Sequence, residues 1–358
     1  MEYSVYPLST DLATGVQIYN NTFTDCKLYP HTLDGALIHD NTWTMSGTRS
    51  AVGHTAFWFK GVEFYNNTVT VSAIEYGTIA VEWWMIYGNS KFYNNTTNGW
   101  FSLGVNPDMD GTGSGVHTPY AYQVYNNTFT STLTSSGFPA LEVMSWLQDI
   151  NIYGNYFTHS GSAYSSYIAI WGRGQLQNFY IHNNIFYRDP VGPYIELSGN
   201  SANSDLDYAY IYNNVFDPGA DSGRWAILVT PSPGSVNNVI AKNDVFNGNN
   251  GGMMAYAGST GNVLQYNDCY APDSGACSGG AGSITSSNNI TGVPQWVASG
   301  NRPSPYYTIT TGSNLYNAGV DVGLPYSGAA SDIGAYEYVS AAQPDTTPPA
   351  APTGLTVS

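Results

Sequence analysis

Three glutamates in similar apolar stretches could carry acid and base chemistry. Glu82, Glu142 and Glu196 each follow an aliphatic residue within a short strand-like run. Because successive side chains of a strand point to opposite faces, the three carboxylates should share one face while the aliphatic residues turn inward. A set of carboxylates can bind hydroxyl groups, protonate a leaving oxygen or activate water. These residues therefore predict an outward-facing catalytic surface.

Flat aromatic rings and cations occur in matching positions of the same runs. Aromatic rings stack on the faces of sugar rings, and carboxylates beside them bind sugar hydroxyls. This combination predicts a polysaccharide groove. The substrate-binding candidates are Trp58, Lys60, Trp84, Trp171 and Arg173.

Two intervening runs set the expected separation of the carboxylates. The run around Ser102 lies between those of Glu82 and Glu142, and the run around Ala169 lies between those of Glu142 and Glu196. If each run is one strand of a stack, neighbouring glutamates are two strands, or about 9.6 Å, apart. Inverting glycosidases hold their carboxylates roughly 6.5–9.5 Å apart and retaining ones about 5–5.5 Å. The spacing favours an inverting glycoside hydrolase, and the alternative is that the glutamates are solvated strand positions.

A long glycine-rich loop, residues 104–120, carries the remaining candidates. Asp108 and Asp110 offer closely spaced oxygen ligands that could hold Ca²⁺, although the distal glutamate of an EF-hand loop is missing. His117 follows in the same loop and is a candidate proton shuttle near the carboxylates. The chemistry requires no other cofactor.

A repeated phrase indicates the elements that position these residues. Tyr-Asn-Asn-Thr-Phe-Thr occurs at residues 19–24 and 125–130, and variants recur about every 20 to 32 residues. An alternating strand-like stretch precedes each copy, and two further short runs follow it. Three strands per repeat at this period predict an all-β parallel β-helix of about 10–11 rungs with few helices. The second Asn or its substitute lies at positions 21, 41, 67, 95, 127, 155, 184, 214, 244, 268 and 289.

The asparagine pair suits a corner between two strands. Asn tolerates the left-handed backbone conformation, and its amide can bond the equivalent Asn one rung away. The phenylalanines that follow should stack inside in the same way. They are Phe23, Phe129, Phe157, Phe186, Phe216 and Phe246.

Composition limits the partners and the compartment. Only 9% of residues are charged and the net charge is −16, which argues against nucleic acid and anionic membranes as partners. No run approaches the roughly 20 apolar residues of a membrane span, and no signal peptide opens the chain, which we interpret as a trimmed piece. Cys269 and Cys277 are close enough in sequence to form a disulfide, which favours export.

The C-terminal residues differ from the repeats. We expect residues 1–295 to form the β-helix, and residues 296–340 to cap its last exposed rung. Residues 341–358 contain a Pro-rich linker.

The Asn-Asn-x-Phe repeats resemble the right-handed parallel β-helix repeat of pectate-lyase-like proteins. Residues 313–337 resemble the ending of large secreted bacterial β-helix proteins, and residues 345–358 look like the truncated start of a fibronectin type III module. The resemblance implies a secreted bacterial protein, monomeric within a longer multi-module chain. Members of this superfamily include lyases, hydrolases, epimerases, adhesins and stalks, so the fold does not decide the function.

Three functions follow as hypotheses. The first is a carbohydrate-active protein that binds and cleaves a polysaccharide, with Glu82, Glu142, Glu196 and His117 as catalytic candidates. The second is a lyase or epimerase acting on uronates. Three outward glutamates argue against it, because they would repel an anionic polymer. The third is a non-catalytic adhesin or stalk.

Overall fold

The chain folds into a parallel β-solenoid, as the repeats predict. The structure is a computed structural model that describes residues 13–26, 28, 33–46, 59–71, 79–84, 86–87, 89–104, 122–131, 139–144, 147–160, 166–171, 175–188, 190–199, 202, 204–219, 224–299 and 306–338. Within these ranges there is no helix, and every strand pairs in parallel with strands of neighbouring rungs.

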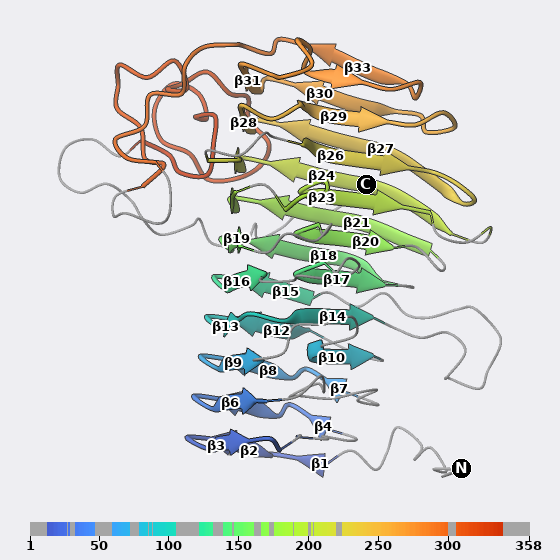
Figure 1. Ribbon diagram of the computed structural model, residues 1–358, viewed down its shortest axis with the longest axis vertical. Coiled ribbons are helices and arrows are strands. Elements are labelled where there is room, and N and C mark those ends of the chain that lie inside the picture. Colours follow the sequence, from blue (N-terminus) through green and yellow to red (C-terminus); the bar gives the residue numbers. More distant parts are fainter. Residues whose placement is uncertain are drawn as a thin grey trace.

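Four sheets run along the long axis of the molecule (Figure 1). The eight-stranded sheet comprises β10 (Ile79–Trp84), β14 (Trp100–Gly104), β17 (Leu141–Met144), β20 (Ile168–Trp171), β23 (Ile195–Ser198), β26 (Trp225–Thr230), β29 (Gly251–Ala255) and β32 (Ser278–Gly279). The eleven-stranded sheet comprises β2 (Gln17–Tyr19), β5 (Leu37–His39), β8 (Glu63–Tyr65), β12 (Ser90–Tyr93), β15 (Tyr122–Tyr125), β18 (Gln148–Tyr153), β21 (Gln175–His182), β24 (Asp205–Tyr212), β27 (Ser235–Lys242), β30 (Asn262–Gln265) and β33 (Ile284–Ser287).

The other two sheets complete the rungs. The ten-stranded sheet comprises β3 (Thr22–Thr24), β6 (Thr42–Met45), β9 (Thr68–Val71), β13 (Thr96–Thr97), β16 (Thr128–Ser131), β19 (Tyr156–His159), β22 (Ile185–Tyr187), β25 (Val215–Asp217), β28 (Val245–Asn247) and β31 (Asp268–Tyr270). A four-stranded sheet comprises β1 (Ala13–Thr14), β4 (Leu33–Asp34), β7 (Phe59–Lys60) and β11 (Ile86–Tyr87).

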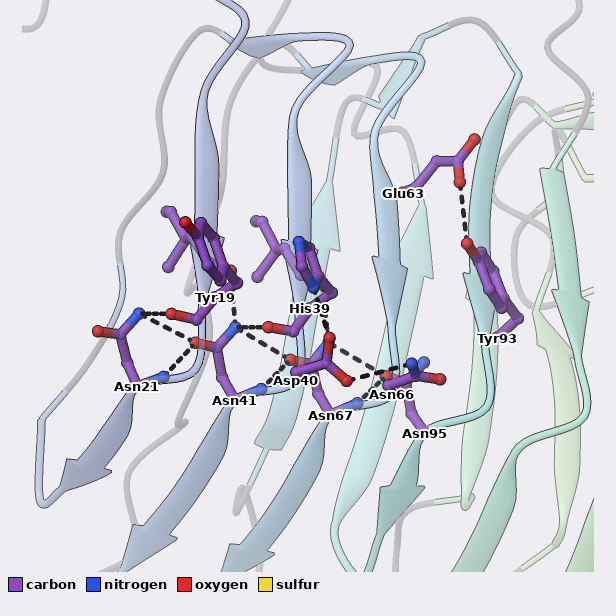
Figure 2. Close-up of polar contacts among 12 residues, drawn as sticks. Tyr19, Asn21, His39, Asp40, Asn41, Glu63, Asn66, Asn67, Tyr93 and Asn95 are labelled. Atoms are coloured by element: carbon purple, nitrogen blue, oxygen red, sulfur yellow. Dashed lines mark hydrogen bonds and ion pairs between the residues drawn. The ribbon is translucent and has the colours of Figure 1, made fainter.

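A ladder of side-chain amides joins the rungs at the corner between the eleven- and ten-stranded sheets (Figure 2). In each rung the backbone N–H and the Nδ2 of one Asn donate to the Oδ1 of the next residue in the ladder, except that Asp244 donates only its N–H. From Asn41 to Asn67 these distances are 3.0 and 3.1 Å, and Asn41 Nδ2 also donates to the Ile18 carbonyl at 2.8 Å. The predicted amide contacts are confirmed. The ladder consists of Asn21, Asn41, Asn67, Asn95, Asn127, Asn155, Asn184, Asn214, Asp244, Asn267 and Asn289.

One rung differs from the prediction, because Asn267 and not Asp268 occupies the ladder. Asp268 is instead the first residue of β31 and pairs with Val245. The residue before each ladder position adopts the left-handed conformation, and here that residue is Tyr266, with φ of 57°. The amide hydrogen bonds set the register of this rung more strongly than the preference of Asn for the left-handed corner.

Stacked aromatic rings fill the interior behind the ladder, as predicted. Phe129, Phe157, Phe186, Phe216 and Phe246 form a continuous stack with ring centroids 4.8–5.2 Å apart. Phe23 stacks on the buried Trp43, which takes the same position in its rung.

The C-terminal segment, residues 306–338, packs along the flank of the ten-stranded sheet. Its buried apolar residues form one cluster with an outward column of that sheet, Tyr156, Ile185, Val215 and Val245. Figure 1 shows the segment, orange to red, beside β28 and β31. The sequence predicted a cap over the last rung, whereas these contacts extend down the side of several rungs.

Asparagines of the corner hold this segment in place. Asn183, Asn213 and Asn243 donate their Nδ2 groups to the carbonyls of Ala335, Asp332 and Val320, at 2.9, 3.1 and 2.7 Å. The same positions in the N-terminal rungs, including Asn66 and Asn94, are exposed. The left-handed residue before each ladder position therefore shapes the corner, and in three rungs it is an Asn that also binds the C-terminal segment.

The predicted disulfide is present. Cys269 and Cys277 are bonded, with their Cα atoms 5.6 Å apart. Cys269 occupies the interior column of β31 opposite Phe246, so the bridge joins the last rung of the ten-stranded sheet to the residue before β32.

Asp244 is the one carboxylate of the ladder, and its position suits an amide. Its Oδ1 accepts from the N–H and the Nδ2 of Asn214 at 2.8 and 2.9 Å, whereas its buried Oδ2 has no hydrogen-bond partner among the described residues. Burial raises the pKa of Asp244 well above its usual value of 3.8, and the bonds from Asn214 offset only part of this rise. A protonated Oδ2 can donate as the neighbouring amides do. The free energy of unfolding should therefore fall as pH rises from the usual carboxyl pKa through the folded-state pKa.

We expect Asp244→Asn to raise the free energy of unfolding at pH 7 by about 1–3 kcal/mol, because the amide satisfies the unpartnered position. The difference between variant and wild type should shrink as the pH falls, which urea unfolding at several pH values would measure. Asn184→Asp is the matched control and should destabilise the protein at pH 7. Equal stability of Asp244→Asn and wild type at every pH would contradict this account.

Candidate functional site

The three predicted glutamates lie in one column of the eight-stranded sheet. Glu82 in β10 is opposite Ser102 in β14, which is opposite Glu142 in β17. Ala169 in β20 follows, and Glu196 in β23 is opposite it. Successive glutamates are therefore two strands, or about 9.6 Å, apart along the axis.

The aliphatic residues beside the glutamates face the core as the alternation predicts. Val81, Leu141, Ile168 and Ile195 occupy the adjacent register column, and each is fully buried in the main hydrophobic cluster. Because neighbours along a strand point to opposite sides, this column fixes the glutamates on the outer side of the sheet.

Two of the glutamates are buried, which differs from the solvated face expected from sequence. Glu82 is 2% exposed and Glu142 is 1% exposed. Ser102 donates its hydroxyl to Glu142 Oε2 at 2.7 Å, so the residue between the two glutamates holds one of them in place. Alternation along a strand predicts the side of a sheet, but it does not predict whether other residues cover that side.

Glu196 is the accessible carboxylate of the column, since it is only partly buried. Burial raises the pKa of Glu196 above its usual range, and a hydrogen bond from the Ser166 side chain offsets part of the rise. A carboxyl group with a raised pKa holds its proton closer to neutral pH, which is the property that a general acid needs.

A second column of the same sheet holds two of the predicted tryptophans. Trp84, Gly104, Met144, Trp171 and Ser198 are successive register partners, each two residues beyond the glutamate column. Trp171 is partly buried, and its indole Nε1 has no hydrogen-bond partner within the described ranges. The indole of Trp171 and the carboxyl of Glu196 are thus the partly exposed members of neighbouring columns.

Lys60 lies on a different sheet from the glutamates. The repeat pattern within the chain matched the run that contains Lys60 with the run that contains Glu82. In the structure, Lys60 in β7 pairs with Asp34 and Tyr87 in the four-stranded sheet. Lys60 therefore does not belong to the strand column of the glutamates, and its role in binding substrate stays a prediction. The two runs do not correspond because a separate strand, β11, follows β10, and β11 is the register partner of β7.

Five predicted residues lie outside the described ranges, and their roles stay predictions. They are Trp58, Asp108, Asp110, His117 and Arg173. Among the described residues, no group of three or more His, Cys, Asp or Glu side chains is placed to hold a metal ion.

Sequence reasoning missed an outward stack of aromatic rings on the eleven-stranded sheet. Tyr19, His39, Tyr65, Tyr93 and Tyr125 stack with centroids 4.7–5.1 Å apart and interplanar angles of 3–5°. The signal was the Tyr or His that precedes nearly every asparagine pair. Stacking covers the ring faces, so this column does not offer the open rings that sugars prefer.

Polar contacts secure the same stack, which favours a structural role. Glu63 accepts from Lys91 Nζ at 2.8 Å and from the Tyr93 hydroxyl at 3.0 Å (Figure 2 shows the latter). Burial and the nearby Glu63 carboxylate raise the pKa of Tyr93 above its usual value, so the phenol stays neutral.

Comparison of the chain with models of protein families, with curated proteins and with solved structures finds no match. No helix within the described residues is long and apolar enough to span a membrane.

Removing the Ser166 hydroxyl should raise the pKa of Glu196 further, because Ser166 stabilises the charged carboxylate. We expect the ¹³C chemical shift of the Glu196 carboxyl in Ser166→Ala to titrate at higher pH than in the wild type. Ser102→Ala is the matched control, since Ser102 bonds Glu142 in another rung. A Glu196 titration unchanged by Ser166→Ala would show that this contact does not set its pKa.

Proposed function

We propose that this protein is a carbohydrate-active β-solenoid that binds a polysaccharide along the eight-stranded sheet and hydrolyses it with inversion. The observation that carries the proposal is the shared column of Glu142 and Glu196, two strands apart. Their separation of about 9.6 Å approaches the roughly 6.5–9.5 Å that leaves room for a sugar and a water between two carboxyl groups.

The environments of the two carboxyl groups suggest their roles. Glu196 is the general acid, because burial raises its pKa while the residue stays partly exposed. It protonates the glycosidic oxygen as the bond to the anomeric carbon breaks. Glu142 is the base, and the hydroxyl of Ser102 orients it. Because Glu142 is almost fully buried, we place the sugar nearest Glu196, with Glu142 activating the attacking water.

The surroundings favour a neutral glycan over a uronate. A lyase or epimerase needs positive charge or a metal ion to neutralise the uronate carboxylate before its α-proton leaves. Lys60 lies on another sheet, and the net charge of the chain is −16. The partly buried Trp171, in the column next to Glu196, supplies a ring for stacking on the sugar.

A non-catalytic stalk or adhesin is the second candidate. The burial of Glu82 and Glu142 and the bond from Ser102 favour it, since buried hydrogen-bonded carboxylates also occur as structural residues. The disulfide between Cys269 and Cys277 is consistent with a pectate-lyase-like protein exported from the cytoplasm in either case. We further propose that the protein is a secreted, monomeric bacterial protein.

Glu142→Gln and Glu196→Gln should each reduce hydrolysis of a cleavable neutral polysaccharide by about 10²–10⁴-fold, because each removes one proton-transfer group. Release of new reducing ends from a panel of glycans measures the loss, and NMR of the first product gives the anomeric configuration. Glu63→Gln, on the eleven-stranded sheet, is the matched control and should retain activity.

Other outcomes of these assays would favour the alternative functions. Unsaturated products absorbing in the ultraviolet would establish the lyase, and a retained anomeric configuration would exclude the two-strand acid and base pair. Glycan binding with no cleavage by the wild type would establish the adhesin.

A further inference from the structure

The outer face of the ten-stranded sheet carries a regular array of threonines in its first five rungs. Thr22, Thr42, Thr68, Thr96 and Thr128 are successive register partners of β3, β6, β9, β13 and β16. The first four are exposed and Thr128 is partly buried, whereas the residues between them and the next column face the core.

A second column runs beside the first, two residues further along each strand. It contains Thr24, Thr44, Thr70 and Thr130, in register with their neighbours. Asn98 interrupts it, because its side chain bonds the backbone N–H and carbonyl of Val71 at 2.8 and 3.0 Å. The two columns form a two-dimensional grid of hydroxyl and methyl groups.

The grid is regular in both directions. Rings on the adjoining eleven-stranded sheet stack at 4.7–5.1 Å with interplanar angles of 3–5°, so successive rungs repeat with very little rotation. Ordinary sheets twist by roughly 20–25° per strand, which would destroy such a grid within a few strands. Along each strand, residues two apart are separated by about 6.6–6.8 Å.

The chemistry of this face limits its ligand. The five strands contain no charged residue, and their aromatic residues face the core, where Trp43 and Phe129 are buried and Phe23 is partly buried. A polysaccharide surface would require exposed rings for stacking, and an ionic ligand would require charge. Uncharged hydroxyls and methyls on a rigid grid can instead order a layer of water.

We propose that this threonine face binds ice. Spacings of this size in two perpendicular directions are close to those between oxygen atoms on planes of hexagonal ice, so water held by the hydroxyls can join the lattice without distortion. The methyl groups limit the other orientations that this water could take. Because the threonines already occupy fixed positions on a rigid sheet, little conformational entropy is lost on binding.

The same sheet supplies an internal contrast. From β19 onward the first column changes to Tyr156, Ile185, Val215 and Val245, and the C-terminal segment covers them. The first threonine column therefore ends where another part of the chain occupies the face, and the second ends one strand later, after Thr158. This inference does not rest on the proposed sugar site, which belongs to a different sheet.

Thermal hysteresis and retention of the purified protein in a slowly growing ice hemisphere test the proposal. We expect the wild type to show both activities, and Thr42→Tyr and Thr68→Tyr to lose most of them, because a protruding ring breaks contact with a flat lattice. Gln17→Tyr, an exposed position on the eleven-stranded sheet, is the matched control and should behave as the wild type. Circular dichroism verifies the fold of each variant, and Thr24→Tyr, in the outermost described strand of the sheet, replaces any variant that does not fold.

Two results would overturn the proposal. One is a folded wild type that neither depresses freezing nor enters ice. The other is ice activity that persists in both threonine variants. Retention of the wild type on crystalline cellulose or chitin, lost in the threonine variants while ice retention is absent, would assign the face to a polysaccharide.

Discussion

The amide ladder is the interaction on which the rest of the structure depends. Each ladder Asn between the two end rungs uses its backbone N–H, its Oδ1 and both hydrogens of Nδ2, as Asn41 does, so a buried corner leaves almost no polar group unsatisfied. These bonds form only when equivalent corners lie directly above one another. The ladder therefore fixes the register of the flanking strands, and each strand position becomes a column along the axis.

Columns allow one simple scaffold to carry different surfaces. The glutamates, the threonines and the stacked tyrosines each occupy a strand position repeated over several rungs. A single substitution on an outer face changes one side chain of a column and leaves the scaffold intact, because the ladder and the interior phenylalanines hold successive rungs together. The flatness of the sheets has the same origin, since stacked rings and amides favour repetition with little rotation.

The change along the ten-stranded sheet shows how side-chain composition decides what covers a surface. Most threonines on the outer face of the first rungs are exposed, where their hydroxyl groups can bond water. Burying valine, isoleucine and tyrosine at the same positions away from water stabilises the fold, and the C-terminal segment supplies the apolar residues that cover them. Asn183, Asn213 and Asn243 then gain a second function, because their buried amides donate to carbonyls of the segment.

The sequence by itself determined the repeat, the parallel solenoid, the interior phenylalanine stack and the disulfide. These features follow from local periodicity and from residue types that recur at the same place in each rung, so no long-range information is needed. The common column of Glu82, Glu142 and Glu196 was predictable for the same reason. Only the tertiary structure decided that Lys60 belongs to another sheet, that Asn267 replaces Asp268 in the ladder, and that two of the glutamates are buried. Register depends on hydrogen bonds between rungs, and burial depends on segments distant in the chain. The residue pattern along one strand carries no information about these hydrogen bonds or these distant segments.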